Sequence, residues 1–282
     1  MPYIMTKIID VVTFNGDPIV ELRLKYLYDV VDEFVIVEAR RTFSGLEKHF
    51  LYRDKMDNVF APYADKIRWM IVDEFPSRPD TWPIQSYMTP GSYDAWWCEE
   101  WQRNLPMTYL KEQASCGKLV AFICDVDEIP SKDAIQMALD RPEVFNDPVY
   151  LKMDFYYYNF QWKKPYPWYH AFAISGEAFT QDINLTFTRV GRVKDRYIFS
   201  GGWHCSYFLS VADLRRKLES FPHRELDTPA INNEAHLRRC LDSGIDIGDR
   251  GGVENLVRCD ALQECIGLQA EDFHKLLVAS QQ

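Results

Sequence analysis

The chain has 282 residues, 47% of them hydrophobic and 15% aromatic, which places it among folded globular proteins and excludes a disordered chain. Its formal net charge of −10 argues against nucleic acid as a partner, because binding to a phosphate backbone depends on a surplus of Lys and Arg. No apolar run approaches the length of a membrane span, no signal-peptide pattern opens the chain, and seven cysteines without a CxxC pair fit reduced thiols, so we predict a cytoplasmic protein with no integral membrane segment.

The first third of the chain alternates between strand and helix patterns. Residues 7–13 and 33–38 are β-rich runs, and residues 18–31 between them carry apolar side chains at helical spacing. A strand, a helix and a strand at this spacing form a βαβ unit, which implies a parallel sheet. A third strand is predicted at residues 67–72.

The middle of the chain contains a long loop and a second strand–helix pair. Residues 73–94 are rich in proline and show no periodicity, so we expect a functional or mobile loop. A helix is predicted over residues 96–115, bent or interrupted at Pro106. Residues 119–123 form an apolar strand, and Ser131 is suited to cap a helix that runs to residue 139.

Beyond residue 148 the chain is dense in aromatic side chains. Residues 185–193 and 196–199 fit strands of an antiparallel ribbon, and helices are predicted near 211–219, 232–241 and 271–279. We therefore predict an α/β fold with a mostly parallel, nucleotide-binding sheet in residues 1–148 and a smaller substrate-binding part in residues 149–282. No linker separates the two parts, so one continuous domain is expected.

Three carboxylates, Asp125, Asp127 and Glu128, follow the buried strand at residues 119–123. Crowded carboxylates repel one another unless a cation lies among them, and hard oxygen ligands favour Mg²⁺ or Mn²⁺. Asp125 and Asp127 are two residues apart, so in an extended backbone they share a face and can approach one cation and a diphosphate. The alternative is a solvated acidic turn, in which Glu128 and Asp133 favour a helix N-terminus.

Other side chains are candidates for the same site. His204 follows a Gly-Gly turn and could complete a metal shell or contact a phosphate, or it could be a hydrogen-bonded histidine beside a buried tryptophan. Arg41, Lys48 and Arg103 are possible phosphate or carboxylate partners, and each could equally be a surface charge.

The aromatic run after residue 155 could form a platform for sugar rings. Aromatic-rich strands are more often core, so we keep only Trp162 and Trp168 as candidates for such a platform. The run contains Tyr156, Tyr157, Tyr158, Phe160, Trp162, Tyr166, Trp168 and Tyr169.

Several short motifs occur in a characteristic order along most of the chain. They are FN at 14–15, ELRL at 21–24, VDEFVIVE at 31–38, TFSG at 42–45 with Lys48, QRN at 102–104, DVDEIP at 125–130, YNFQW at 158–162, GWHCSYF at 202–208 and SFPHRE at 220–225. Together they resemble glycosyltransferase family seventeen, from Phe14 to about Asp227.

This resemblance implies a GT-A-like fold, a UDP-sugar donor such as UDP-N-acetylglucosamine, a glycan acceptor and inversion at the anomeric carbon. It also implies Mn²⁺ (or Mg²⁺) on Asp125 and Asp127, with His204 as the further candidate ligand. The residues expected to bind the nucleotide-sugar are Thr13, Phe14, Asn15, Glu38, Lys48, Arg103 and Asp125. Residues 1–148 then become the nucleotide-sugar half and residues 149–282 the acceptor half.

Inversion in a single displacement requires a base near the attacking hydroxyl and a stabilised leaving group on the opposite side. Asp127, through its metal, would serve the leaving group. The candidates for the base are carboxylates of the C-terminal half, and we select Glu225 because it closes the last family-like motif. The full set is Glu177, Asp182, Glu225 and Asp227.

Two other classes of protein remain open. A metal-dependent phosphohydrolase of the haloacid-dehalogenase type also has a DxD after a strand, although there a Thr follows the second acid, where this chain has Glu128. A non-catalytic carbohydrate-binding protein would use the aromatic run and would not need the DxD. The sequence predicts no oligomeric state.

Overall fold

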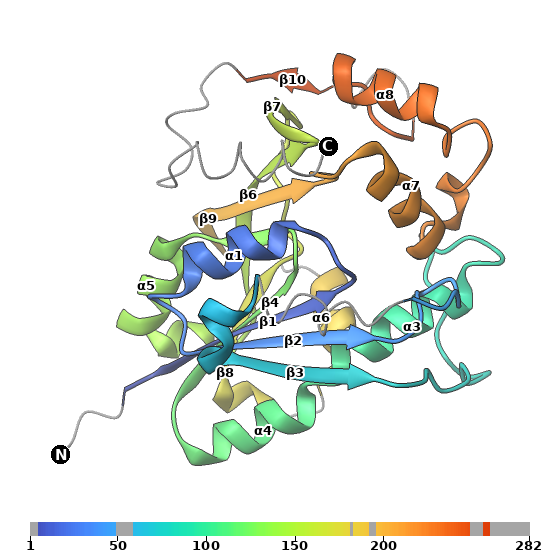
Figure 1. The fold of residues 1–282 in the computed structure, drawn as a ribbon. Coiled ribbons are helices and arrows are strands. Elements are labelled where there is room, and N and C mark those ends of the chain that lie inside the picture. The colour runs from blue at the N-terminus through green and yellow to red at the C-terminus, as the bar shows by residue number, and fades with distance from the viewer. Residues whose placement is uncertain (1–4, 49–58, 181–182, 192–195, 249–255, 260–282) are drawn as a thin grey trace.

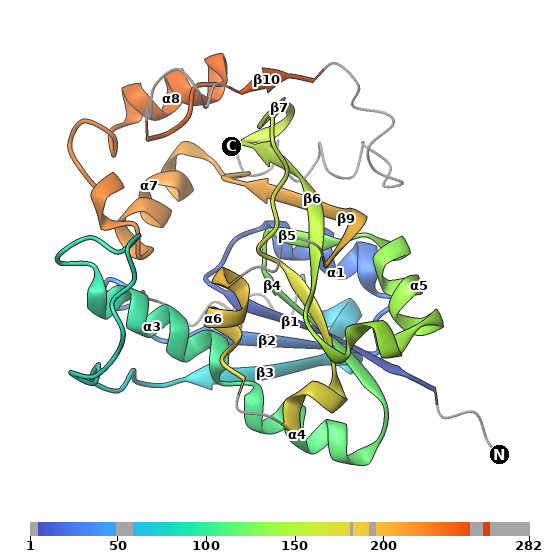
Figure 2. The same cartoon turned by 180° about the vertical axis from the view of Figure 1, so that it is seen from behind.

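One ten-stranded sheet forms the centre of the molecule (Figures 1 and 2). The computed structural model describes residues 5–48, 59–180, 183–191, 196–248 and 256–259. The main strand order is β10-β7-β6-β8-β4-β1-β2-β3, and β9 pairs with both β5 and β6. Helices cover the sheet, so the predicted α/β class is confirmed.

The N-terminal part of the sheet is parallel. Its strands are β1 (Lys7–Phe14), β2 (Glu33–Ala39), β3 (Ile67–Val72) and β4 (Leu119–Asp125), in the order β4-β1-β2-β3. β2 is buried along its whole length, which explains its near-continuous apolar sequence. The predicted strands at 7–13, 33–38, 67–72 and 119–123 are confirmed.

Helices cover both faces of this parallel part. Figure 1 shows α1 (Ile19–Leu27) above the sheet and α4 (Met107–Cys116) below it. α5 (Lys132–Asp140) packs on the same side as α1, in a core that includes Ile8, Leu22 and Ile135. Leu110 of α4 and Val35 belong to the core on the opposite face. Apolar side chains of both strand faces are therefore removed from water, the main favourable contribution to folding.

Local sequence signals set several helix boundaries. The helix predicted over 96–115 is divided at Pro106 into α3 (Tyr93–Asn104) and α4. A break is favoured there because proline has no backbone N–H to donate to the preceding turn of a helix. Ser131 caps α5, because its side-chain oxygen accepts a hydrogen bond from the Ala134 N–H at 3.1 Å. The helix predicted over 18–31 is shorter than expected and ends at Leu27.

The aromatic strands extend the same sheet. β8 (Phe172–Ser175) runs antiparallel to β4 and so joins the two parts of the chain. β6 (Val149–Tyr157) pairs antiparallel with β7 (Asn159–Lys163) and β8, but parallel with β9 (Tyr197–Ser206). β6 and β7 thus form an antiparallel aromatic ribbon, as predicted, whereas the strand predicted at 196–199 belongs to β9 and runs parallel to β6. β5 (Glu128–Pro130) is antiparallel to β9.

Residues 185–193 were predicted as a strand and instead contain the helix α6 (Leu185–Val190). The Asn184 side chain accepts hydrogen bonds from the N–H groups of Thr186 and Phe187, both at 3.0 Å, which caps the helix. The Asn104 side chain of α3 accepts a third bond, from the Leu185 N–H at 2.8 Å. Capping and the contact with α3 thus override the β propensity of the sequence LTFTRV.

The C-terminal helices pack against the aromatic strands. They are α7 (Val211–Ser220) and α8 (Glu234–Ser243), and they share an apolar core with Phe155, Tyr157 and Tyr158 of the aromatic run. Most of that run is therefore core, as the alternative interpretation expected. The helix predicted at 271–279 lies outside the described residues. The remaining short elements are η1 (Ala61–Lys66), η2 (Pro142–Asn146), η3 (Gly176–Thr180), η4 (Arg224–Leu226) and β10 (Val257–Arg258).

Candidate active site

The predicted acidic site lies where β1 and β4 end side by side. Thr13 of β1 and Asp125 of β4 are register partners in the parallel pair. After β1, the chain adds β2 and β3 on one side of β1, and it then crosses over to add β4 on the other side. The direction in which strands are added therefore reverses between β1 and β4. In open α/β sheets, ligands bind in the crevice outside the carboxyl ends of the strands at such a switch point.

Arg23 holds the acidic turn in place. Its guanidinium, which is almost fully buried, makes two hydrogen bonds to Asp10 at 2.7 and 2.5 Å. A third nitrogen donates to the backbone carbonyls of Asp125, Val126 and Glu128 at 3.2, 3.3 and 2.5 Å. Burial opposes the charged form, but Asp10 outweighs burial and raises the pKa of Arg23. Arg23 therefore stays charged, and its hydrogen bonds to three backbone carbonyls fix the conformation of the turn.

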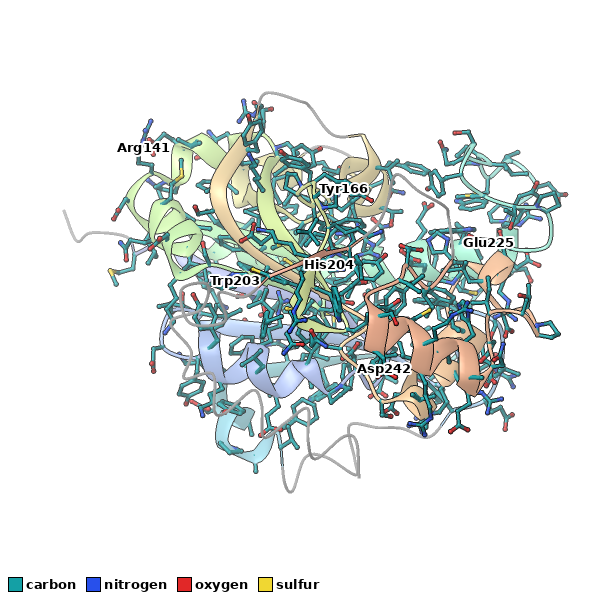
Figure 3. All side chains as sticks on the ribbon, turned by 90° about the horizontal axis from the view of Figure 1, so that it is seen from above. Arg141, Tyr166, Trp203, His204, Glu225 and Asp242 are labelled. Atoms are coloured by element: carbon teal, nitrogen blue, oxygen red, sulfur yellow. The ribbon has the colours of Figure 1, made fainter. Side chains whose placement is uncertain are left out.

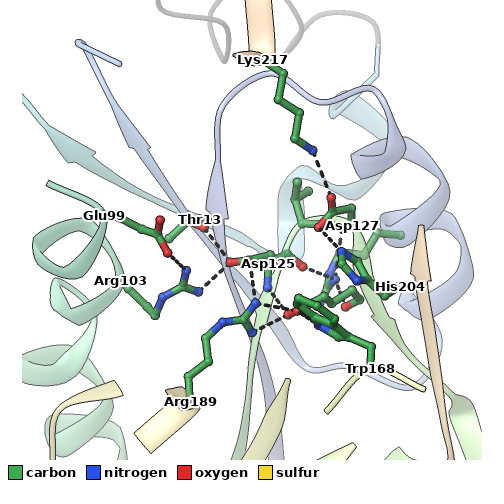
Figure 4. A network of polar contacts seen from close by, with 12 residues as sticks. Thr13, Glu99, Arg103, Asp125, Asp127, Trp168, Arg189, His204 and Lys217 are labelled. Atoms are coloured by element: carbon green, nitrogen blue, oxygen red, sulfur yellow. Dashed lines mark hydrogen bonds and ion pairs between the residues drawn. The ribbon is translucent and has the colours of Figure 1, made fainter. Parts of the chain in front are cut away.

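Asp125 lies between two arginines (Figure 4). Arg103 of α3 donates to one carboxylate oxygen at 2.6 Å, and Arg189 of α6 donates to the other at 2.5 Å. The Thr13 hydroxyl is 3.4 Å from the first of these oxygens. Burial would raise the pKa of Asp125, but the two guanidiniums outweigh it and lower the pKa to about 2. Asp125 is therefore an anion whose two oxygens are both in ion pairs.

Glu128 shares Arg189 with Asp125. Its carboxylate is fully buried and accepts two hydrogen bonds from Arg189, at 2.7 and 2.6 Å. It also accepts from the Asp125 backbone N–H at 2.7 Å and from the indole N–H of Trp168. Trp168, predicted as a candidate sugar platform, thus orients a carboxylate, and Trp162 packs against Gly244 at the end of α8.

Asp127 has different partners. One oxygen lies 3.1 Å from the Lys217 ammonium of α7, and the other lies 3.6 Å from Nε2 of His204. Burial would raise the pKa of Asp127, but Lys217 and His204 outweigh it and hold the pKa well below its usual range. Lys217 is also 3.5 Å from Asp17, whose pKa rises to about 6 because of burial and the charge of Asp127, against the effect of Lys217.

His204 lies close to both a carboxylate and aromatic rings. Its ring is stacked on Phe155, with centroids 4.6 Å apart, and its centroid is 4.3 Å from that of Trp168. Its Nδ1 atom is buried and has no hydrogen-bond partner among the described residues. His204 is therefore packed among aromatic rings and faces Asp127, and its role as a metal or phosphate ligand stays a prediction.

Few side chains at this edge of the sheet are placed to bind a divalent metal ion. No group of three or more His, Cys, Asp or Glu side chains in the described ranges is arranged to hold one. Asp127 and His204 supply one oxygen and one nitrogen donor close together. The carboxylate oxygen is the kind of donor that Mg²⁺ or Mn²⁺ prefers, and an ion held by so few side chains would take its other ligands from substrate phosphates and water. Asp125 offers no oxygen outside its ion pairs with arginine.

Some of the residues predicted to bind the nucleotide are accessible, and others are buried. Thr13 and the exposed Asn15 lie at the open end of β1, whereas the Phe14 side chain is in the core, 5.9 Å from Phe60 between ring centroids. Glu38, at the end of β2, is fully buried with Lys48 3.7 Å away. Burial lowers the pKa of Lys48, against the effect of Glu38. Because the Phe14 side chain is buried, Phe14 can face a nucleotide only through its backbone atoms.

Glu225 lies in η4, just after α7, with its carboxylate 2.7 Å from Nδ1 of His223. Figure 3 shows it to one side of His204, and no interaction described here joins it to Asp125 or Asp127. Its side chain is 41% exposed, so it is accessible to a ligand.

The other candidate bases lie in different places. Glu177 follows Ser175, the register partner of Val120 near the start of β4, so it lies towards the opposite edge of the sheet from Asp125. Asp227 is paired with Arg224 at 2.6 Å, and Asp182 lies outside the described residues.

Four residues of the site were not among those predicted from the sequence: Asp17, Arg23, Arg189 and Lys217. A signal existed for Lys217, because Leu214 and Leu218 mark the buried face of α7 and a lysine between them requires a partner. Arg189 gave no signal, since the segment was expected to be a strand.

Comparison with known proteins places the chain in a family. Residues 3–250 match the model of glycosyltransferase family 17. The chain belongs to this family. Its curated relatives include the β-1,4-mannosyl-glycoprotein 4-β-N-acetylglucosaminyltransferases of Rattus norvegicus and Homo sapiens, each 26% identical over 168 residues. That match covers 56% of this chain and 28% of each relative, so the chain spans only part of the length of these proteins.

Similar solved structures include two crystals of the galactosyltransferase LgtC, one of an active-site mutant (11% identity, TM-score 0.32) and one of a complex with donor and acceptor sugar analogues (12% identity, TM-score 0.29). Each of these matches covers 98% of this chain and 97% of the other. Mannose-1-phosphate geranyltransferase from Thermus thermophilus matches at 13% identity over 70% of both chains, with a TM-score of 0.30. No helix in the described ranges of this family 17 chain has the length and apolar character needed to span a membrane.

Proposed function

We propose that this chain transfers N-acetylglucosamine from UDP-N-acetylglucosamine to a hydroxyl of a glycan, with inversion at the anomeric carbon. Membership of family 17 and the printed activity of its relatives support this assignment. The observation that carries it is the position of Asp127, which faces His204 and Lys217 beside the switch point of the sheet. A GT-A-like fold is part of the same proposal.

The donor would lie across the carboxyl ends of β1 and β4. Thr13 and Asn15 would contact the nucleoside. The predicted contact from Glu38 is not kept, because its side chain is fully buried beside Lys48. Asp127 and His204 would hold Mn²⁺ or Mg²⁺ beside the diphosphate. Asp125, which is paired with Arg103 and Arg189, would keep the acidic turn in position. When bound, the ion would supply positive charge that stabilises the departing UDP.

Both parts of the chain would contribute to donor binding. Residues 1–148 supply the crevice, while His204, Arg189 and Lys217 come from residues 149–282, which would also bind the acceptor. Lys217, which lies 3.1 Å from Asp127, would also pair with a phosphate oxygen of the donor, because an ammonium has no fixed direction of bonding.

Glu225 is the base in this proposal. Its carboxylate is accessible, and His223 fixes its orientation through a 2.7 Å contact. A carboxylate so held can accept a proton from a sugar hydroxyl as that hydroxyl attacks. If Glu225→Gln retained near-normal transfer, this assignment would be wrong.

Neither alternative class has an observation in its favour. A phosphohydrolase of the haloacid-dehalogenase type needs a free nucleophilic carboxylate, but both oxygens of Asp125 are bonded to arginine. A carbohydrate-binding protein that uses the aromatic run needs a platform of several exposed rings, but only Tyr166 of that run is exposed, at 41%.

A thermal-shift screen of UDP, UDP-N-acetylglucosamine and other nucleotides, with and without Mn²⁺, tests the proposal. A ligand that binds only the folded state raises its apparent stability. We expect UDP and UDP-N-acetylglucosamine to raise Tm only when Mn²⁺ is present. Stabilisation by UDP without any metal would remove the metal from the proposal, and no response to any nucleotide would overturn the proposal as a whole.

A further inference from the structure

A cluster of aromatic side chains lies in the loop between β3 and α3 and in α3 itself. Tyr87 and Trp96 meet edge to face with centroids 5.1 Å apart. Trp82 and Trp97 form a second pair at 5.9 Å, and their indole N–H groups donate to Glu100 at 2.8 Å and to the Pro76 carbonyl at 2.7 Å. The loop is thus anchored by its inner tryptophans, while Tyr87 remains 37% exposed.

This cluster is continuous with the Asp125 side of the site. Trp96, Glu99 and Arg103 lie on one face of α3, at spacings of three and four residues. Arg103 pairs with Glu99 at 2.7 Å and with Asp125 at 2.6 Å. Trp96 therefore lies about 10 Å along the helix axis from Arg103, the residue that contacts Asp125. A sugar beside Trp96 would lie next to the donor site without occupying it.

The cluster also reaches the base proposed above. The His223 ring lies edge to face with Trp96, with centroids 4.9 Å apart, and Nδ1 of His223 is 2.7 Å from the Glu225 carboxylate. Tyr87, Trp96, His223 and Glu225 thus form one surface, here called the aromatic wall. It joins η4, after α7, to the loop after β3.

The chemistry of the aromatic wall suits a neutral sugar. Pyranose rings have an apolar face that packs on aromatic rings, and their hydroxyls bond to carboxylates and imidazoles. Burial, followed by the charges of Glu99 and Glu100, raises the pKa of Tyr87 to about 12, so its hydroxyl remains a hydrogen-bond donor at neutral pH. Carboxylates at Glu99 and Glu225 disfavour a phosphate-bearing ligand here.

We propose that the aromatic wall is the acceptor subsite, in which a pyranose ring of the glycan packs on Trp96 and Tyr87 while its hydroxyl faces Glu225. The proposal rests on the proposed function, since it supplies the acceptor for that transfer. It assigns acceptor recognition to the loop after β3, and not to the aromatic strands where Trp162 and Trp168 were first considered.

The test measures sugar binding and UDP binding separately. Wild type, Trp96→Ala and Tyr87→Ala are compared with the control Tyr166→Ala. This control removes a 41% exposed ring from the aromatic run after residue 155, which is not part of the aromatic wall. The sugar probes are the methyl β-glycosides of mannose, galactose and N-acetylglucosamine, titrated by saturation-transfer NMR with UDP and Mn²⁺ present and absent. UDP binding is followed by the Tm shift in Mn²⁺.

We expect both wall variants to lose about tenfold or more in affinity for the glycoside that wild type binds best, while the UDP-induced Tm shift and the control stay as in wild type. Glycoside binding that is unchanged in both variants, or absent in wild type under all conditions, would overturn the subsite. Loss of the UDP shift in wild type would instead overturn the proposed function, while the glycoside titrations without UDP would still decide whether the wall binds sugar. Tyr87→Ala, at the more exposed ring, keeps the test valid if Trp96→Ala does not fold.

Discussion

Asp125 and Asp127 are two residues apart in one motif, yet their surroundings differ in kind. Asp125 is paired with two guanidiniums, Arg103 and Arg189, that are themselves almost fully buried. Asp127 faces the ammonium of Lys217 and the imidazole of His204, at longer distances. A planar guanidinium makes a rigid, directional contact, and each arginine donates one hydrogen bond to a different oxygen of Asp125. An ammonium is a mobile point charge, and an imidazole can ligate a metal.

The difference indicates a division of labour within the motif. The Asp125 side, with Glu128 and Arg189, has the character of a structural lock between β4 and α6. In the proposed function, the partners of Asp127 would exchange for a ligand. Loss of the lock should then lower stability, and loss of Asp127 should remove ligand binding.

Arg189→Leu should have the largest effect on stability. It leaves Glu128 fully buried without its cation and removes one partner of Asp125, so the free energy of unfolding should fall by about 3–5 kcal/mol. Urea unfolding measures the change. The control is Arg238→Leu, which breaks an exposed pair with Glu234 on α8 and should change stability by less than about 0.5 kcal/mol. Equal effects of the two variants would show that no lock exists.

Asp127→Asn should leave the chain folded and remove the response to ligand. We expect the Mn²⁺-dependent Tm shift with UDP to disappear, and the release of UDP from UDP-N-acetylglucosamine to fall on the order of 100-fold, because the charge that would hold the ion is lost. Asp147→Asn, at an exposed carboxylate, is the control. A full UDP shift in the Asp127 variant would assign donor binding to other residues.

Trp168→Phe should weaken the lock without breaking it. The variant keeps a ring beside His204 but removes the N–H that donates to Glu128, so a decrease of about 2 kcal/mol in unfolding free energy is expected. Thermal or urea unfolding would detect it. Trp101→Phe, at a ring that is 39% exposed, should change stability far less. A neutral Trp168→Phe would mean that Arg189 alone is enough to satisfy Glu128.

Asp17 should give the smallest effect, visible as a pH dependence. Its pKa is raised from 3.8 to about 6 in the folded protein, so the folded state favours the protonated form. The stability that this preference contributes is complete below about pH 4 and is lost as pH rises through about 6. Asp17→Asn cannot titrate. Relative to wild type it should therefore gain about 1–2 kcal/mol between about pH 4.5 and pH 7.5 in urea unfolding. A pH-independent difference between the two proteins would contradict the raised pKa.

Local patterns in the sequence predicted a large part of the fold. Apolar runs identified the four parallel strands, and a proline and a serine marked the end of α3 and the start of α5, because burial and capping act over a few residues. The same reasoning failed at α6, where Asn184 and Asn104 supply caps from side chains that are 80 residues apart in the chain. It also failed for β9, whose parallel pairing with β6 depends on the path of the intervening chain.

By itself the sequence determined the family-like motifs, the buried strand that ends at Asp125 and the acidic turn after it. Only the tertiary structure decided what surrounds each carboxylate. Arg23, Arg103, Arg189 and Lys217 reach the turn from four different helices, and side-chain pairing across such distances leaves no periodic trace in a sequence. The two carboxylates of one motif therefore differ because packing places two guanidiniums beside Asp125, and an ammonium and an imidazole beside Asp127.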